Sequence, residues 1–289
     1  MPSPDPLPDA FIGHGNPMNA IEHNRYTETW RAFGASVPRP RGVLVISAHW
    51  FIGSTAVTAM AHPRTIHDFY GFPDELFAFA YPASGAPDLA QEIADVVRPH
   101  WVGLDHDSWG LDHGAWSVLS HMFPDADVPV VQLSINALEP LDYHFDVGSR
   151  LAPLRHRGVL IVASGNVVHN LHLIDGSRAA EGFDWARRFN EAAVEVMTEK
   201  PGDVLTLQDH EDFALAVPTA DHFIPLLYLA GLADASAHRA HVLVDGYTMG
   251  SLSMAAYGLG TRRPVVTDET GAAPSLPDPS IVAPEDTNT

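Results

Sequence analysis

The chain has 289 residues, a formal net charge of −20 at pH 7 and no cysteine. The charge argues against nucleic acid and anionic membrane surfaces as partners, and the lack of cysteine leaves only His, Asp, Glu or backbone oxygen to hold a metal. No stretch approaches the ~20 apolar residues of a membrane span, and the segment MPSPDPLPDAF lacks the basic flank of a signal peptide, so we expect a cytoplasmic protein.

Strand-like and helix-like segments then alternate along the chain. In chain order we predict a strand at 9–15, a helix at 25–33, strands at 42–48 and 55–60, helices at 87–98 and 114–123, a strand at 128–135, a helix at 138–157, a strand at 158–166, and helices at 183–197 and 221–232. This alternation predicts one α/β domain, over residues 9–262, with a mostly parallel or mixed central sheet and helices on both faces. Residues 263–289 are acidic and rich in proline, and we expect a disordered tail there.

Histidines follow three of the predicted strands. His14 lies between two glycines after the first strand, His49 lies near the end of the run GVLVISAHW, and His169 follows the run LIVASGN. In an open α/β sheet, ligands bind in the crevice at the carboxyl ends of the strands. Two further histidines, His113 and His222, open predicted helices that can reach the same edge. We therefore expect these five side chains to gather in one crevice.

A single histidine at a strand end is more often a packed or hydrogen-bonded residue than a ligand. Three strands that end in this way make coincidence a weaker explanation. We interpret the remaining histidines as surface or core residues. The chain contains no HExxH, GxSxG, GxGxxG or Walker motif, so the evidence for a chemical function rests on the histidines.

Several segments that contain these histidines also resemble a known family. They are FIGHGNPMNAI, VISAHWF, TIHDFYGFP, LDHGAWSVL, VVQLSI, ASGNVVHNL, and HFIPLLY with GSLSM. Together they look like the 4,5-DOPA dioxygenase branch of the class III extradiol ring-cleaving dioxygenases, the LigB-type superfamily. The resemblance runs in order and at natural spacing from about residue 9 to about residue 260. It implies one α/β domain with a single metal site in the crevice.

The resemblance also implies roles for the five histidines. Those that match the family's metal-binding positions are His14, His49, His169 and His222. We expect the first, second and fourth of these to be the core ligands. We expect His169 to be either a fourth ligand or the base that takes the second catechol proton. His113 matches the family's acid/base histidine, and Asp112 is our candidate for the residue that fixes its orientation.

The residues indicate which side chains bind the metal more clearly than they indicate which metal is bound. Extradiol cleavage inserts both atoms of O₂ into a catechol and breaks the ring bond beside the two hydroxyls, for which Fe(II) held by two histidines and one carboxylate is the usual centre. Here His222 stands where the wider superfamily has a carboxylate, and an all-histidine set is more typical of zinc. We expect Fe(II) in the active enzyme and Zn(II) in the isolated protein, because zinc binds nitrogen ligands more tightly.

The loop HDFYGFP at residues 67–73 has two interpretations. In the first, Tyr70 and Phe72 cover a catechol ring and Asp68 meets a substrate amino group. In the second, the loop is an ordinary turn with aromatic packing. Asn166 and Asn170, which flank the His169 loop, are likewise either braces of that loop or substrate contacts.

The leading hypothesis is an Fe(II) extradiol dioxygenase that acts on a catechol such as DOPA with O₂. One alternative is a zinc hydrolase in which a metal-bound water attacks an amide or ester. The other is a non-catalytic binding protein with the same fold. Oxygen consumption with catechols separates the first two. The histidine expected to act as acid or base argues against the third, because a binding module does not need one beside its metal.

Overall fold

An eight-stranded mixed sheet forms the centre of the computed structural model, which describes residues 5–260 and 272–273. Its strands are β1 (Asp9–Gly13), β2 (Gly42–Ile52), β3 (Ala56–Thr58), β4 (Gly103–Asp105), β5 (Val130–Asn136), β6 (Val159–Gly165), β7 (Ala240–Val244) and β10 (Ala256–Leu259), in the spatial order β4-β3-β5-β2-β6-β1-β10-β7. The four central strands β5, β2, β6 and β1 pair in parallel. β3 and β10 join them antiparallel on either side. The expected mixed α/β sheet is therefore confirmed.

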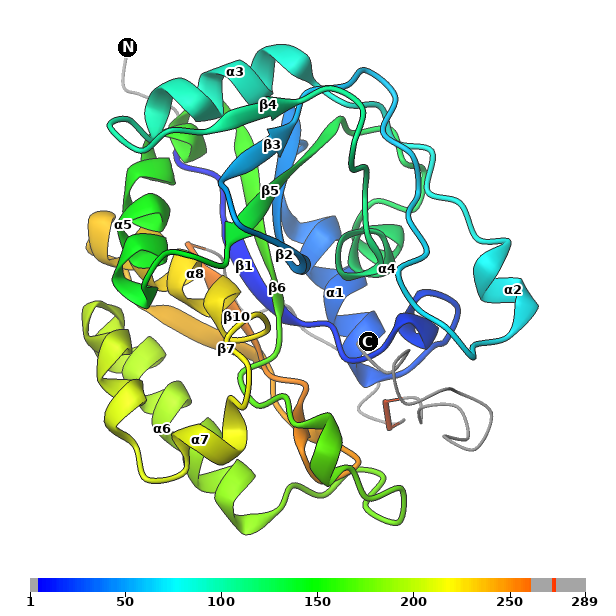
Figure 1. The fold of residues 1–289 in the computed structure, drawn as a ribbon, viewed down its shortest axis with the longest axis vertical. Helices are drawn as coiled ribbons and strands as arrows, with labels where there is room; N and C mark the ends of the chain where they lie inside the picture. The colour runs from blue at the N-terminus through cyan, green and yellow to red at the C-terminus, as the bar shows by residue number, and fades with distance from the viewer. Residues whose placement is uncertain (1–4, 261–271, 274–289) are drawn as a thin grey trace.

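Helices cover both faces of this sheet (Figure 1). The α-helices are α1 (Arg25–Ser36), α2 (Asp74–Phe77), α3 (Pro87–Val96), α4 (His113–Met122), α5 (Leu141–Leu151), α6 (Asp184–Glu199), α7 (Phe213–Ala216) and α8 (Ile224–Ala235). Short 3₁₀ helices lie at Pro17–Ala20, Ala152–Arg157, Leu171–Leu173 and Pro201–Asp209, and a small hairpin joins β8 (Tyr247–Thr248) to β9 (Leu252–Ser253). One core cluster contains residues of α1 and α4, and the other contains residues of α3, α5, α6 and α8.

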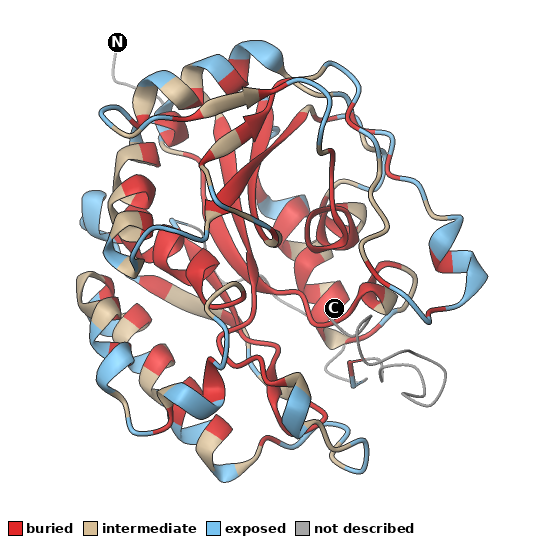
Figure 2. Ribbon diagram, viewed as in Figure 1, coloured by how far each residue is buried: buried red, intermediate tan, exposed pale blue. Residues whose placement is uncertain are grey.

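The central strands supply apolar side chains to both of these cores. Val43 and Val45 of β2 pack in the α1/α4 cluster, whereas Leu44 and Ile46 pack in the cluster on the opposite face. Successive residues of a strand point to opposite faces, so a strand covered on both sides must be continuously apolar. Figure 2 shows the result as central strands buried between helices whose outer faces are exposed, while the edge strands β4 and β7 are partly buried.

Two predicted elements differ from those in the structure. β2 continues to Ile52, so His49 lies within the strand, where its pairing with β5 shifts register between Ile46 and Phe51. The helix expected at 138–157 is α5 followed by a 3₁₀ helix. Pro153 accounts for this break, because proline has no backbone N–H and its ring clashes with the preceding turn of an α-helix.

The ends of the chain add little to the described fold. The disordered tail expected at residues 263–289 lies outside the described residues, apart from Ala272 and Ala273. Ala273 is buried and packs in the α1/α4 cluster. Within the described part of the chain, no helix is both long enough and apolar enough to cross a membrane.

Candidate metal centre and active site

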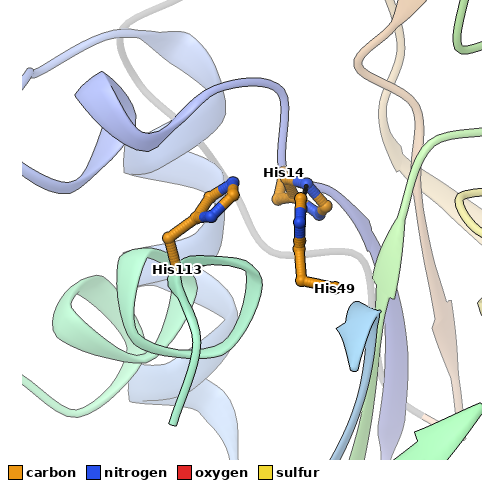
Figure 3. A group of neighbouring side chains, drawn as sticks. All are labelled: His14, His49 and His113. Atoms are coloured by element: carbon orange, nitrogen blue, oxygen red, sulfur yellow. Dashed lines mark hydrogen bonds between the residues drawn. The ribbon is translucent and has the colours of Figure 1, made fainter. Parts of the chain in front are cut away.

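His14 and His49 come together at the carboxyl edge of the parallel strands. His14 directly follows β1, and its backbone N–H donates to the carbonyl oxygen of Gly165 at the end of the neighbouring β6. His49 reaches the same point from β2, on the other side of β6. The two Nε2 atoms face each other at 3.1 Å, and Figure 3 shows both rings beside the ring of His113.

Hydrogen bonds determine which nitrogen of His14 carries its proton. The Nδ1 atom of His14 lies 3.0 Å from the hydroxyl oxygen of Ser164. That hydroxyl donates its only hydrogen to the carbonyl oxygen of Gly114, at 2.6 Å. Ser164 can therefore only accept from His14, so Nδ1 carries the hydrogen and Nε2 keeps its lone pair.

Asp68 has the same effect on His49 and also contacts His113. One carboxylate oxygen, Oδ2, lies 3.3 Å from Nδ1 of His49 and 3.0 Å from Nδ1 of His113. The other oxygen, Oδ1, accepts the backbone N–H of His113 at 3.0 Å. An ionised carboxylate can only accept, so these two contacts favour hydrogen on both Nδ1 atoms, although neither has full hydrogen-bond geometry. The loop containing Asp68 thus contributes to the centre through contacts with two histidines, a role that neither interpretation of the loop included.

His113 begins α4 and is completely buried, with its ring centroid 3.8 Å from that of His49. The expectation that Asp112 orients this ring is wrong. The carboxylate of Asp112 instead accepts from Ser47 Oγ at 2.7 Å, from Gln132, and from the backbone N–H of Ala115 in the first turn of α4. Asp112 therefore caps the helix that carries His113, and Asp68 orients the ring.

His222 and His169 form the other side of the centre. Their rings stack at a centroid distance of 3.5 Å and an interplanar angle of 4°. His222 lies just before α8, and its Nδ1 atom is hydrogen-bonded to the carboxylate of Asp221. Its ring centroid lies 5.4 Å from that of His14 and 5.0 Å from that of His49. All five predicted histidines therefore gather in one place.

The electrostatics of the cluster favour neutral imidazoles. Burial, together with the other histidines, lowers the pKa of His14, His49 and His169 well below the usual value. Burial alone would raise the pKa of Asp68 and Asp221, but interaction with positive charge at the adjacent histidines, together with hydrogen bonds, outweighs it and holds both values low. A bound cation would supply such a charge while the rings stay neutral, which is the form that binds a metal through nitrogen.

The arrangement of lone pairs fits a cation. The Nε2 atoms of His14 and His49 are two acceptors that face each other with no hydrogen between them, which is unfavourable unless a positive charge lies beside them. The Nε2 atom of His222 is buried and, within the described chain, has no hydrogen-bond partner. One ring nitrogen from each of His14, His49 and His113 falls within 4.8 Å of the others. His113 therefore lies closer to the ligand candidates His14 and His49 than its expected acid/base role suggested.

Other residues expected near the centre mostly brace it. Asn166 donates to the carbonyl oxygen of Ser253 at 2.7 Å, and Asn170 donates to that of Leu215 at 2.8 Å, so both hold the His169 loop in place. Phe72 is buried in the α1/α4 cluster, as ordinary packing requires.

Tyr70, the other aromatic residue considered as a cover for a catechol ring, is 60% exposed.

Three residues that contact the site histidines were not identified from the sequence. Asp221 was adjacent to a candidate ligand in the sequence, and its acidity beside a histidine was the available signal. Ser164 lay inside an apolar strand, where a serine with no obvious partner was the signal. Phe69, which packs edge-on against His113 at a centroid distance of 5.6 Å, could not be distinguished from other aromatic residues of its loop.

Comparison with known proteins shows which family the chain belongs to. Residues 14–260 match the model for the catalytic LigB subunit of aromatic ring-opening dioxygenase. The chain therefore belongs to the LigB family and is an extradiol ring-cleaving dioxygenase, as the sequence motifs predicted. Members of this family depend on a metal, and the group formed by His14, His49 and His113 could hold one.

Individual relatives cover nearly the whole chain. An Escherichia coli K12 protein named 4,5-DOPA dioxygenase extradiol is 45% identical over 88% of this chain and 95% of its own length. A Beta vulgaris protein of the same name is 34% identical, over 86% of this chain and 94% of its own length. The crystal structure of an uncharacterized Escherichia coli K12 protein, 42% identical, matches with a TM-score of 0.76 over 88% of this chain and 100% of that one.

Proposed function

We propose that the protein uses Fe(II) and O₂ to cleave the ring of a catechol such as DOPA. The observation that carries this proposal is the pair of Nε2 lone pairs on His14 and His49, which face each other at 3.1 Å with their Nδ1 atoms held by acceptors. The substrate class is supported by the names of relatives that share 45% and 34% of their residues with the chain.

The ligands we propose are His14, His49 and His222. Each has its Nδ1 atom next to an acceptor, which is a serine hydroxyl for the first and an aspartate for the other two. This contact fixes the tautomer and leaves Nε2 for the metal. His169 is proposed as a fourth ligand or as the base, since its ring lies against that of His222. When bound there, Fe(II) would supply the electron transfer that allows O₂ to react with a catechol.

The protein residues handle the protons of this reaction. A catechol must lose its hydroxyl protons before the ring opens, and His169, neutral because burial lowers its pKa, can accept the second one. His113 has a buried Nε2 atom without a partner among the described residues, from which it can exchange a proton with an oxygen atom. The bond broken joins a hydroxyl-bearing ring carbon to its unsubstituted neighbour. Both oxygen atoms enter the product, so no external reductant is needed.

Zinc is proposed to occupy the same ligands in the isolated protein. Zinc binds nitrogen ligands more tightly than Fe(II) does, so metal content after purification is a poor guide to the active metal. The test is therefore to remove all metal and reload the protein without oxygen, with Fe(II) in one sample and Zn(II) in another. Each sample then receives O₂ and a panel of catechols.

We expect oxygen uptake and a ring-opened product with Fe(II) and neither with Zn(II). DOPA, dopamine, 3,4-dihydroxyphenylpropionate and unsubstituted catechol make up the panel, and mass spectrometry with ¹⁸O₂ shows whether both oxygen atoms are retained. Activity that is equal with zinc, or a product that lacks either oxygen atom, contradicts the proposal.

A further inference from the structure

We infer that Asp68 is a positioning residue that a proposed metal ligand, His49, and the proposed acid/base residue, His113, share. A single carboxylate oxygen orients both rings, so the hold on the metal and the exchange of a proton depend on the same side chain. The inference about the proton rests on the proposed function, whereas the inference about the metal does not.

The geometry requires one oxygen to serve two rings. Oδ2 of Asp68 lies 3.0 Å from Nδ1 of His113 and 3.3 Å from Nδ1 of His49, while the two ring centroids are 3.8 Å apart. Oδ1 is engaged separately, by the backbone N–H of His113 at 3.0 Å. The carboxylate is therefore anchored to the first residue of α4, which fixes the position of the oxygen between the rings.

This oxygen affects whether Nε2, on the far side of each ring, carries a hydrogen or a lone pair. Because it can only accept, its contacts at 3.0 and 3.3 Å favour the tautomer with hydrogen on Nδ1 of both histidines, although neither contact has full hydrogen-bond geometry. His49 then presents a lone pair at Nε2, directed at Nε2 of His14, 3.1 Å away. His113 presents its Nε2 atom to the same buried space, where it has no partner among the described residues. No other carboxylate in the described part of the chain contacts two of the five histidines.

Asp221 is the natural comparison, because it contacts the ring of only one histidine, His222. If Asp68 acts through both of its histidines, its loss must affect metal binding and the proton exchange of His113, whereas loss of Asp221 leaves the contacts of His113 unchanged. The isosteric changes Asp68→Asn and Asp221→Asn remove the charge and the acceptor-only character with little change in volume.

The first measurement is metal affinity without any catechol. Zn(II) is titrated into metal-free wild type and each variant against a chromophoric chelator. We expect the dissociation constant to rise about 10- to 100-fold for both variants, the usual effect of removing a hydrogen-bond partner of a metal-binding histidine. A value for Asp68→Asn within threefold of wild type overturns the inference for His49. Because no catechol is present, this result stands whether or not the protein cleaves one.

The second measurement is a double-mutant cycle on kcat at saturating Fe(II) and catechol. We expect Asp68→Asn to lower kcat about 100-fold in the wild-type background, with KM changed less than threefold. In a His113→Ala background the same change should have almost no effect on kcat, because the residue it acts through is gone. Asp221→Asn should have the same effect on kcat in both backgrounds. Equal effects of Asp68→Asn in the two backgrounds overturn the inference for His113.

A third measurement needs no variant and therefore does not depend on its folding. In zinc-loaded wild type labelled with ¹⁵N-histidine, the ring nitrogen shifts identify which nitrogen carries hydrogen. We expect hydrogen on Nδ1 of both His49 and His113. Hydrogen on Nε2 of His49, or a bare Nδ1 on His113, overturns the inference directly. If wild type consumes no oxygen with any catechol, the proposed function fails while the affinity and NMR results still test the role of Asp68.

Discussion

Nε2 of His14 lies 3.1 Å from Nε2 of His49, while a serine and an aspartate hold the opposite nitrogens of the two rings. The two residues are 35 positions apart in the sequence and come from strands separated by β6. Two buried lone pairs at this distance repel each other in the absence of a cation. A cation beside the two nitrogens would remove this repulsion, as expected of a preorganised metal site.

Ligand and proton donor can be separated by two substitutions. His49→Ala should lose both bound metal and turnover, because it removes one of few protein ligands. His113→Ala should keep its metal and lose turnover by roughly 10²- to 10⁴-fold, the usual contribution of a positioned proton donor or acceptor. Metal analysis and oxygen uptake on the two variants, prepared in parallel, provide the measurement.

The grouping of His113 with His14 and His49 makes this comparison informative. If His113→Ala loses its metal, then His113 is a ligand and the proposed division of roles is wrong. Retention of metal by His49→Ala would mean that the histidine of GVLVISAHW is only a packed residue of a buried strand.

The hydroxyl of Ser164 should contribute to metal affinity without touching the metal. Ser164→Ala removes the hydroxyl oxygen that Nδ1 of His14 contacts and frees that ring to turn. We expect the Zn(II) dissociation constant to rise about 10-fold. Ser117→Ala is the matched control, because Ser117 is also buried, and its hydroxyl has no hydrogen-bond partner among the described residues. An equal rise in both variants would show that the effect is one of packing.

The gathering of the histidines could be predicted from the sequence because it follows from strand patterning. Each continuous apolar run marks a central strand, and parallel strands bring their carboxyl ends to one edge. This rule alone predicts a common location for His14, His49 and His169. The predicted helix starts placed His113 and His222 at the same edge, and both lie in the cluster.

The carboxylates that orient these rings could not be predicted in the same way. Asp68 lies 45 residues from His113, in a loop without periodicity, so nothing local indicates which side chain it meets. Asp112 was the nearer candidate in the sequence, but an aspartate before a helix satisfies backbone N–H groups of the first turn, and this is what it does. Sequence proximity therefore favoured the wrong partner.

Acid should destabilise the protein partly through a histidine outside the site. Burial lowers the pKa of His144 from 6.5 to about 4, although hydrogen bonds to Asn136 and Glu139 oppose the shift. The unfolded chain binds the proton more readily, so this group costs no stability above pH 6.5 and destabilises the fold progressively between pH 6.5 and pH 4. The loss amounts to about 2 kcal/mol between pH 8 and pH 5.

His144→Gln removes this titration while keeping a polar side chain near the hydroxyl of Tyr228. Urea unfolding of metal-free wild type and variant at pH 8 and pH 5 provides the measurement. The free energy of unfolding should fall less between the two pH values for the variant, by about 2 kcal/mol. Parallel losses in the two proteins would show that His144 is not responsible. The buried site histidines titrate in both proteins and cancel in the comparison.

A methyl group at Gly114 should disturb the site from the helix that faces it. A Cβ atom at this position would lie 2.4 Å from Ser47 Oγ and 2.9 Å from Cδ2 of His49, so the His49 ring must move. Alanine is a better helix former than glycine by about 1 kcal/mol, so the change does not weaken α4 by itself. We expect Gly114→Ala to lower kcat about 100-fold, since a displacement of about 1 Å at a reacting centre has that effect.

Gly176→Ala is the matched control, because a Cβ atom there meets nothing within 4 Å. Oxygen uptake with a catechol and urea unfolding are measured for both variants. Gly114→Ala should lose activity and bind Zn(II) more weakly, while Gly176→Ala should match wild type in both respects. If Gly114→Ala keeps wild-type activity, the His49 ring tolerates displacement. The close packing of α4 against β2 is then not what fixes the positions of the site histidines.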